Sequence, residues 1–259
     1  MKKSMVAVAI VLLLVPVSVL AEVVSTDWSD SRTNTSGILA NDGWNGGPPT
    51  GSNGFELSWN ITQASNGLFT YTYTISGGDV NVLSKGLSHW ILEGTDPSVL
   101  SDFGNLTVTG TYKSGSYTVS DPFLSGGLGT WTEQQGSPNL PSDIYGLKIN
   151  LQIPNPSGGT SLVGLDTATI SFTTYHQPVW GDFYAADGQY NPPGPEPQYR
   201  VTAWNTNFGT DPTITTTDFT GWITTPDSIV PEPGLCVLGF GALVAGVFAR
   251  RQARKKTAS

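Results

Sequence analysis

Two neighbouring segments in the first third of the chain alternate between apolar and polar residues. Apolar side chains occupy every second position of residues 55–61 and again of residues 69–75, with Thr, Ser, Asn or Glu between them. A period of two, rich in aromatic and β-branched residues, is typical of strands that bury one face. Ser65-Asn66-Gly67 lies between the two segments and suits a short loop. The pattern therefore predicts a β-hairpin.

Weaker patterns of the same kind continue along the chain, separated by clusters of Gly, Pro, Ser, Asn and Asp. We expect further strands at residues 87–92, 106–112, 116–120, 145–153, 168–175, 198–205 and 218–224. The clusters at residues 125–127 and 154–159 are predicted turns. Between residues 22 and 229, no stretch repeats apolar residues at helical spacing over three turns. The sequence thus predicts an all-β domain, an antiparallel β-sandwich of jelly-roll-like type rather than a closed barrel.

The segments that precede and follow this domain in the sequence differ from it in composition. Residues 22–54 are rich in Gly, Asn, Ser and Pro, which predicts an irregular lead-in with one short strand near residues 37–40. The sandwich is expected at residues 55–224, and residues 225–234 are expected to be a linker. About two hundred residues are enough for one all-β domain.

The N-terminus has the features of an export signal. Lys2 and Lys3 precede an apolar stretch at residues 5–17, and small residues follow up to Ala21. This order predicts a signal peptide over residues 1–21, a helix removed after Ala21. A retained N-terminal membrane helix is the alternative, which the shortness of the apolar stretch disfavours.

The C-terminus combines a turn-forming motif, an apolar segment and a basic cluster. The motif is Val230, Pro231, Glu232 and Pro233. Residues 235–249 are apolar and are expected to form a single transmembrane helix. At about 1.5 Å per residue they span about 22 Å, less than the roughly 30 Å of a bilayer core. Residues 250–259 form a basic cytoplasmic tail that stops transfer through Arg250, Arg251, Arg254, Lys255 and Lys256. The positive-inside rule then places residues 22–229 outside the inner membrane.

Together these C-terminal features resemble the PEP-CTERM proteins of Gram-negative bacteria. The resemblance implies that an exosortase, a membrane processing enzyme, recognises the tail and cleaves near the motif. It implies a precursor tethered transiently to the inner membrane, then a place at the cell surface or in the extracellular matrix, in contact with exopolysaccharide. Gly234-Leu235 stand where the family usually has a small hydroxyl residue, so the cleavage point stays open. Residues 87–93 and 178–188 are also similar to segments of some PEP-CTERM ectodomains.

Charge separates the expected domain from its targeting segments. The whole chain has a net charge of −8, but residues 22–229 hold five basic and nineteen acidic residues, a net charge of −14. Such a domain lacks the clustered cations that phosphate binding requires, so no nucleic-acid partner is expected. Cys236, the single cysteine, lies in the apolar tail. The exported domain is therefore expected to fold without a disulfide.

Few residues suggest chemistry. His89 and Glu93 would share one face of a strand and could act together in acid–base catalysis or as metal ligands. A structural role for His89 is expected instead, because a metal site needs a third ligand and none is near in sequence. Asp182, Asp187 and Asn191 supply oxygen atoms around a Gly-containing segment, a possible structural calcium site. Otherwise no cofactor is expected, and the ligand of the domain is not predicted. His176 is the second of two histidines.

Three functions remain open at this point. Motifs for common nucleophilic, phosphate-binding and metalloprotease sites are missing, which favours a non-enzymatic envelope or matrix protein with no catalytic residues. A carbohydrate-binding module would need exposed aromatic rings. Trp59 and Trp90 are predicted core residues, whereas the places of Trp44, Trp131, Trp180 and Trp204 are open. A polysaccharide-acting enzyme would need two carboxylates about 5 to 10 Å apart in a cleft.

Overall fold

The computed structural model describes residues 25–227, apart from residues 27, 42–43, 45–53, 79–82, 85, 95–99, 134–138 and 191–198. The predicted signal peptide, Val230–Pro233 motif, transmembrane segment and basic tail lie outside the described residues. Within the described ranges, no helix has the length and apolar character needed to cross a bilayer.

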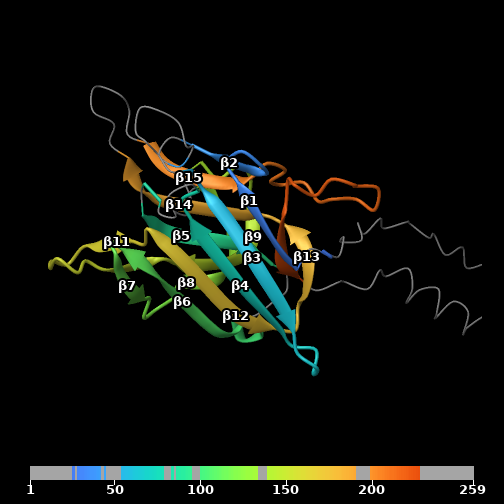
Figure 1. Cartoon of the computed structure of the whole chain (residues 1–259), viewed down its shortest axis with the longest axis horizontal. Coiled ribbons are helices and arrows are strands. Elements are labelled where there is room, and N and C mark those ends of the chain that lie inside the picture. Colours follow the sequence, from blue (N-terminus) through green and yellow to red (C-terminus); the bar gives the residue numbers. More distant parts are fainter. Residues whose placement is uncertain are drawn as a thin grey trace, which may run out of the picture. The chain divides into compact units, whose positions relative to one another are not determined.

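The first sheet has six strands, all paired antiparallel (Figure 1). Its order across the sheet is β1 (Ser29–Thr33), β3 (Glu56–Gln63), β4 (Phe69–Ser76), β12 (Thr167–Thr174), β6 (Gly104–Tyr112) and β7 (Gly115–Thr118). The predicted hairpin is confirmed as β3 and β4, which pair from Glu56 opposite Ser76 to Gln63 opposite Phe69.

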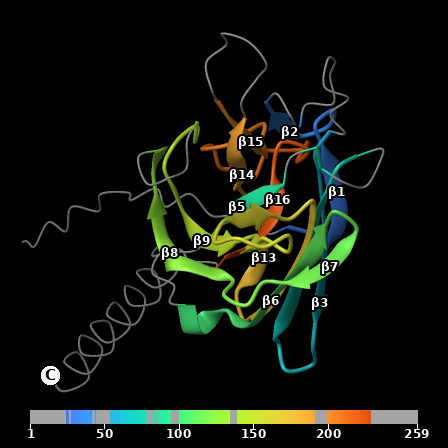
Figure 2. The same cartoon turned by 90° about the vertical axis from the view of Figure 1, so that its left-hand side faces the viewer.

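The second sheet also has six antiparallel strands, several of which lie opposite the first sheet in Figure 2. Its order is β2 (Ile38–Ala40), β15 (Tyr199–Asn205), β14 (Phe183–Tyr190), β5 (Leu87–Glu93), β9 (Ile144–Asn150) and β8 (Phe123–Trp131). Two short pairs complete the strands: β13 (Gln177–Gly181) with β16 (Ile223–Asp227), and β10 (Gln152–Pro154) with β11 (Leu162–Gly164). One 3₁₀ turn, η1 (Leu100–Asp102), precedes β6.

Aromatic side chains from the two sheets meet in the core. In β4 every second residue is buried, so the Tyr71 and Tyr73 rings point inward while the threonines between them face outward. The Tyr73 ring lies 4.9 Å from that of Trp90 in the second sheet, and Phe172 of β12 stacks on Tyr71 at 5.4 Å. These contacts join the sheets face to face, which confirms the prediction of an antiparallel β-sandwich.

The structure corrects several predicted boundaries. The segment at residues 22–54 was expected to be irregular with one strand, but it contributes both β1 and β2. The predicted turn at residues 125–127 lies inside β8, where the register with β9 shifts. The last expected strand, residues 218–224, begins only at Ile223 and runs to Asp227, so the first residues of the expected linker belong to β16. Strands β8, β11, β13 and β14 were not predicted.

Candidate functional site

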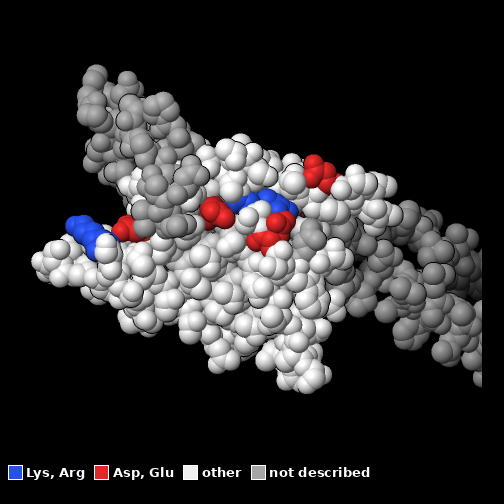
Figure 3. All heavy atoms as spheres, in the orientation of Figure 1, with Lys and Arg blue, Asp and Glu red and all other residues white. Residues whose placement is uncertain are grey.

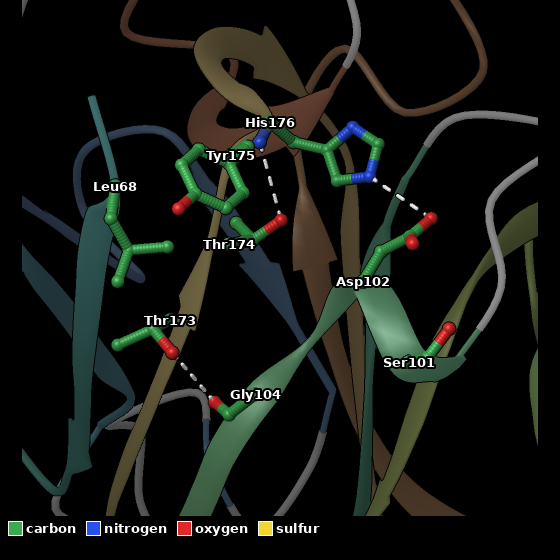
Figure 4. A pocket seen from close by; sticks show the side chains of 8 residues that line it. All are labelled: Leu68, Ser101, Asp102, Gly104, Thr173, Thr174, Tyr175 and His176. Atoms are coloured by element: carbon green, nitrogen blue, oxygen red, sulfur yellow. Dashed lines mark hydrogen bonds and ion pairs between the residues drawn. The ribbon is translucent and has the colours of Figure 1, made fainter. Parts of the chain in front are cut away.

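An open pocket of about 500 Å³ lies at one end of the first sheet (Figure 4). Its walls come from the ends of three strands and from η1: Leu68, Ser101, Asp102, Gly104, Thr173, Thr174, Tyr175 and His176. The register of β12 and β6, with Thr173 opposite Gly104, brings the two parts of the wall together. Tyr175 follows the end of β12 and is 67% exposed, so an aromatic ring is available to a ligand at this pocket.

His176 and Asp102 are the ionisable pair of this pocket. His176 Nε2 lies 3.5 Å from Asp102 Oδ2, as the dashed line in Figure 4 marks. The imidazole stacks on Phe103, with ring centroids 5.7 Å apart and planes at 22°. The backbone around it is held as well, because His176 N–H donates to Thr174 Oγ1 and the Tyr71 hydroxyl donates to the His176 carbonyl. The ring is thus fixed in orientation, with one edge toward a carboxylate.

The pocket does not assemble a hydrolytic triad. Nucleophilic catalysis by serine requires its hydroxyl to hydrogen-bond to the imidazole that takes its proton. Ser101 is the serine of the pocket, and within the described part of the chain its hydroxyl makes no hydrogen bond. The arrangement of an exposed tyrosine beside a fixed His–Asp pair suits the binding of a polar ligand.

His89 and Glu93, the pair suggested by the sequence, take part in separate contacts. His89 is buried in β5, its Nδ1 lies 2.9 Å from the Ser88 hydroxyl, and its ring packs on Tyr184. Glu93 is at the other end of β5, where its Oε2 accepts a hydrogen bond of 2.6 Å from the backbone N–H of Asp182. His89 and Glu93 thus have separate partners at opposite ends of β5.

Glu93 instead belongs to a buried acidic network with Asp182. Asp182 Oδ1 accepts a 2.7 Å hydrogen bond from the side chain of Asn205, and its Oδ2 accepts one of 2.6 Å from the Gly209 N–H. Asn205 also accepts from the Phe183 N–H. The network ties β5 to β14 and to the turn after β15, so its polar groups hold one end of the second sheet together.

Burial perturbs the protonation of both acids. It raises the pKa of Glu93 to about 8, helped by the charge of Asp182 and opposed by the Asp182 N–H. Burial likewise raises the pKa of Asp182 to about 6, although the Gly209 and Asn205 donors act in the opposite direction. Such values are suited to a general acid. Both oxygens of Asp182, however, already accept hydrogen bonds from a backbone N–H and a side-chain amide. This carboxylate therefore has a structural role.

The calcium site expected at Asp182, Asp187 and Asn191 stays a prediction, because only two of its three residues are described. The prediction assumed a loop, but residues 183–190 form β14. Asp182 and Asp187 are five residues apart along an extended chain, roughly 15 Å, whereas one calcium ion binds oxygen atoms at about 2.4 Å. Asn191 lies outside the described residues. Over the described ranges, no group of three or more His, Cys, Asp or Glu side chains is placed to hold a metal ion.

The tryptophans mainly build the core. The predictions for Trp59 and Trp90 are confirmed, since they are 3% and 0% exposed. Of the four left open, Trp44 and Trp180 are buried, and Trp131 and Trp204 are half-buried. These four side chains therefore do not form the exposed, coplanar platform that the carbohydrate-binding alternative requires.

The pocket residues carry little signal in the sequence. Asp102 and Tyr175 resemble any surface acid or tyrosine, and His176 stood out only because the chain has two histidines. Comparison with family models, with curated proteins and with solved structures found no match to this chain.

Proposed function

We propose that this protein is an exported, non-enzymatic component of the cell envelope or extracellular matrix, sorted by a PEP-CTERM signal. The observation that carries the proposal is the order of the C-terminal features: Val230–Pro233, the apolar residues 235–249, then the basic cluster from Arg250 to Lys256. An exosortase would recognise the extended Pro-Glu-Pro backbone outside the bilayer, where the two prolines disfavour a helix. The inner membrane holds the precursor only until cleavage, after which the domain reaches the cell surface or the exopolysaccharide matrix.

The proposal includes the finer features of the fold. A signal helix at residues 1–21 and a transmembrane helix at residues 235–249 flank the sandwich. We also propose that the sandwich is of jelly-roll type. The repeated passage of the chain between the two sheets, for example from β4 to β5 to β6, supports this part of the proposal. An aromatic core without disulfides suits a domain that folds after crossing the inner membrane as an unfolded chain.

Intact-mass measurement of the exported protein tests the proposal. When the full chain is made in its producing cells, we expect the exported form to lack residues 1–21 and to end near the Pro-Glu-Pro motif. An exported form that retains residues 235–259 would refute sorting by cleavage. The double variant Pro231→Ala, Pro233→Ala should remain uncut in the membrane fraction. Ser228→Ala, just before the motif, is the matched control and should be released like the natural chain.

A further inference from the structure

The outer face of the first sheet is covered with hydroxyl side chains. In β4 and β12 the outward positions between the buried residues are all Thr or Ser. We call this surface the hydroxyl face, and define it by the outward residues of β1, β3, β4, β12, β6 and β7. In the orientation of Figure 1, Figure 3 shows the region of β4, β12 and β6 without acidic or basic side chains.

The strand register aligns six of these hydroxyls into one row across all six strands. The row is Ser31, Ser58, Thr74, Thr169, Thr109 and Thr118, each directly opposite the next. At about 4.8 Å between neighbouring strands, the row is about 24 Å long. Within the part of the chain that the structure describes, none of the six hydroxyls hydrogen-bonds to another group. The row therefore offers six donors and acceptors to a ligand.

A second row on the same face is partly occupied by internal bonds. Thr72 Oγ1 lies 3.3 Å from the Ser171 hydroxyl, and Thr107 Oγ1 donates to the Ser171 carbonyl. At the edge of the face, Thr111 Oγ1 lies 2.9 Å from Thr167 Oγ1. The row of six differs from these neighbours in having its hydroxyls free.

Two hollows of about 360 Å³ lie along the row. The first is lined by Ser31, Ser58 and Thr74 among others, and the second by Thr109, Thr118 and Thr169. All six members of the row thus line one hollow or the other. A ligand that follows the row would be long, and would sit in both hollows at once.

We propose that the hydroxyl face binds a neutral polysaccharide chain laid across the strands, along the row of six hydroxyls. A polymer with a hydroxyl-bearing unit at each step can exchange its hydrogen bonds to water for bonds to the row. A negatively charged polymer is disfavoured, because the net charge of residues 22–229 is −14. The cores of protein interfaces are rich in apolar and aromatic side chains, which this face lacks, so a protein partner is disfavoured as well.

The twist of the sheet also selects the ligand. Neighbouring strands rotate by roughly 20 to 25° relative to one another, so the row follows a curved path. A planar lattice such as an ice surface cannot stay in contact with all six strands, whereas a flexible polymer can follow the curve. The inference goes beyond the proposed sorting and does not depend on the C-terminal tail.

Affinity electrophoresis of the full chain in a non-ionic detergent tests this inference. The probes are three neutral polymers (hydroxyethyl cellulose, dextran and galactomannan) and the anionic polymer alginate. We expect retardation by at least one neutral polymer and none by alginate. The triple variant Thr74→Val, Thr109→Val, Thr169→Val keeps side-chain shape and strand preference but removes three hydroxyls, and should bind roughly tenfold more weakly. The corresponding Thr→Ser variant should bind like the natural chain.

Two further variants make the test decisive. Thr130→Val changes an exposed threonine in β8 of the second sheet and should leave binding unchanged. The double variant Ser31→Ala, Ser58→Ala removes hydroxyls at the other end of the row and decides the matter if the triple variant does not fold. Equal binding by the Val or Ala variants, no binding to any neutral polymer, or a preference for alginate would overturn the inference. The inference would also be overturned if the protein bound no polymer but formed a dimer, or inhibited ice growth, in a way that the row variants abolish. Tail release is measured separately by mass, so a failure here leaves the proposed sorting untouched.

Discussion

The buried carboxyl of Glu93 should make the fold less stable as the pH rises. Its pKa is about 8 in the folded protein and near 4.5 in an unfolded chain. Below pH 4.5 Glu93 is protonated in both the folded and the unfolded state, so its ionisation does not change the free energy of unfolding. Between the two values the unfolded chain releases the proton while the folded chain keeps it, and stability is lost until the pH passes about 8. Asp182, with a pKa raised to about 6, acts in the same direction at lower pH.

The size of the effect follows from the two pKa values. At about 1.4 kcal/mol per pH unit, the difference between 4.5 and 8 corresponds to roughly 5 kcal/mol for a carboxyl shut off from water. The Glu93 carboxyl is buried, but the residue as a whole keeps some exposure to solvent, so we expect about 2 to 3 kcal/mol. In Glu93→Gln the amide oxygen can still accept from the Asp182 N–H.

Urea unfolding of the full chain from pH 5 to pH 9 measures this effect. The natural chain should lose about 2 to 3 kcal/mol over this range, and Glu93→Gln should lose clearly less, ending more stable at pH 9. Glu56→Gln, on the outer face of β3, is the matched control and should follow the natural curve. A stability that rises from pH 5 to pH 8, or a Glu93→Gln curve parallel to the natural one, would show that the buried acid does not control the pH dependence.

Three substitutions test other parts of the sandwich by urea unfolding at pH 6. Tyr73→Phe removes the hydroxyl that donates a 2.8 Å bond to the buried Thr224 carbonyl and should cost about 1 to 3 kcal/mol; a cost near zero would contradict that bond. Phe172→Ala empties a site stacked between core tyrosines and should cost about 3 to 5 kcal/mol, unless the core collapses to fill it. Gly37→Ala places a Cβ 2.0 Å from the Thr220 carbonyl oxygen at a φ of 84° and should cost roughly 3 kcal/mol. An unchanged stability would contradict the positive φ of Gly37 and its close approach to Thr220.

The first sheet could be predicted from the sequence because one of its faces packs in the core and the other faces solvent. Strands β3 and β4 bury alternate residues only, so their period of two is visible in the sequence. Strand β1 escaped prediction because Ser29–Thr33 is polar throughout, as suits an edge strand that buries little.

The second sheet was harder to predict because both of its faces are covered. In β5 and β14, Trp90 and Ala185 face the main core while Ile91 and Tyr184 face a smaller apolar cluster on the other side. Burial on both sides removes the alternation on which the strand prediction relied. In β14 the Asp187-Gly188 pair added a turn signal, yet these residues lie at a bulge between β5 and β15. Asp187, which was expected in a ligand-bearing loop, lies in this bulged strand.

The candidate pocket and the hydroxyl face depend on register, which alternation alone does not determine. His176 and Asp102 are far apart in sequence and meet only because β12 pairs with β6. Outward threonines in one strand reflect the strand preference of threonine, so their presence in β4 or β12 alone indicates nothing beyond a sheet. A shift of β3 by two residues would keep its alternation but place Glu56 or Asn60 where Ser58 lies, which would break the row. The continuous alignment from Ser31 to Thr118 is therefore a property of the folded sheet, and binding experiments on the row test the fold and its ligand together.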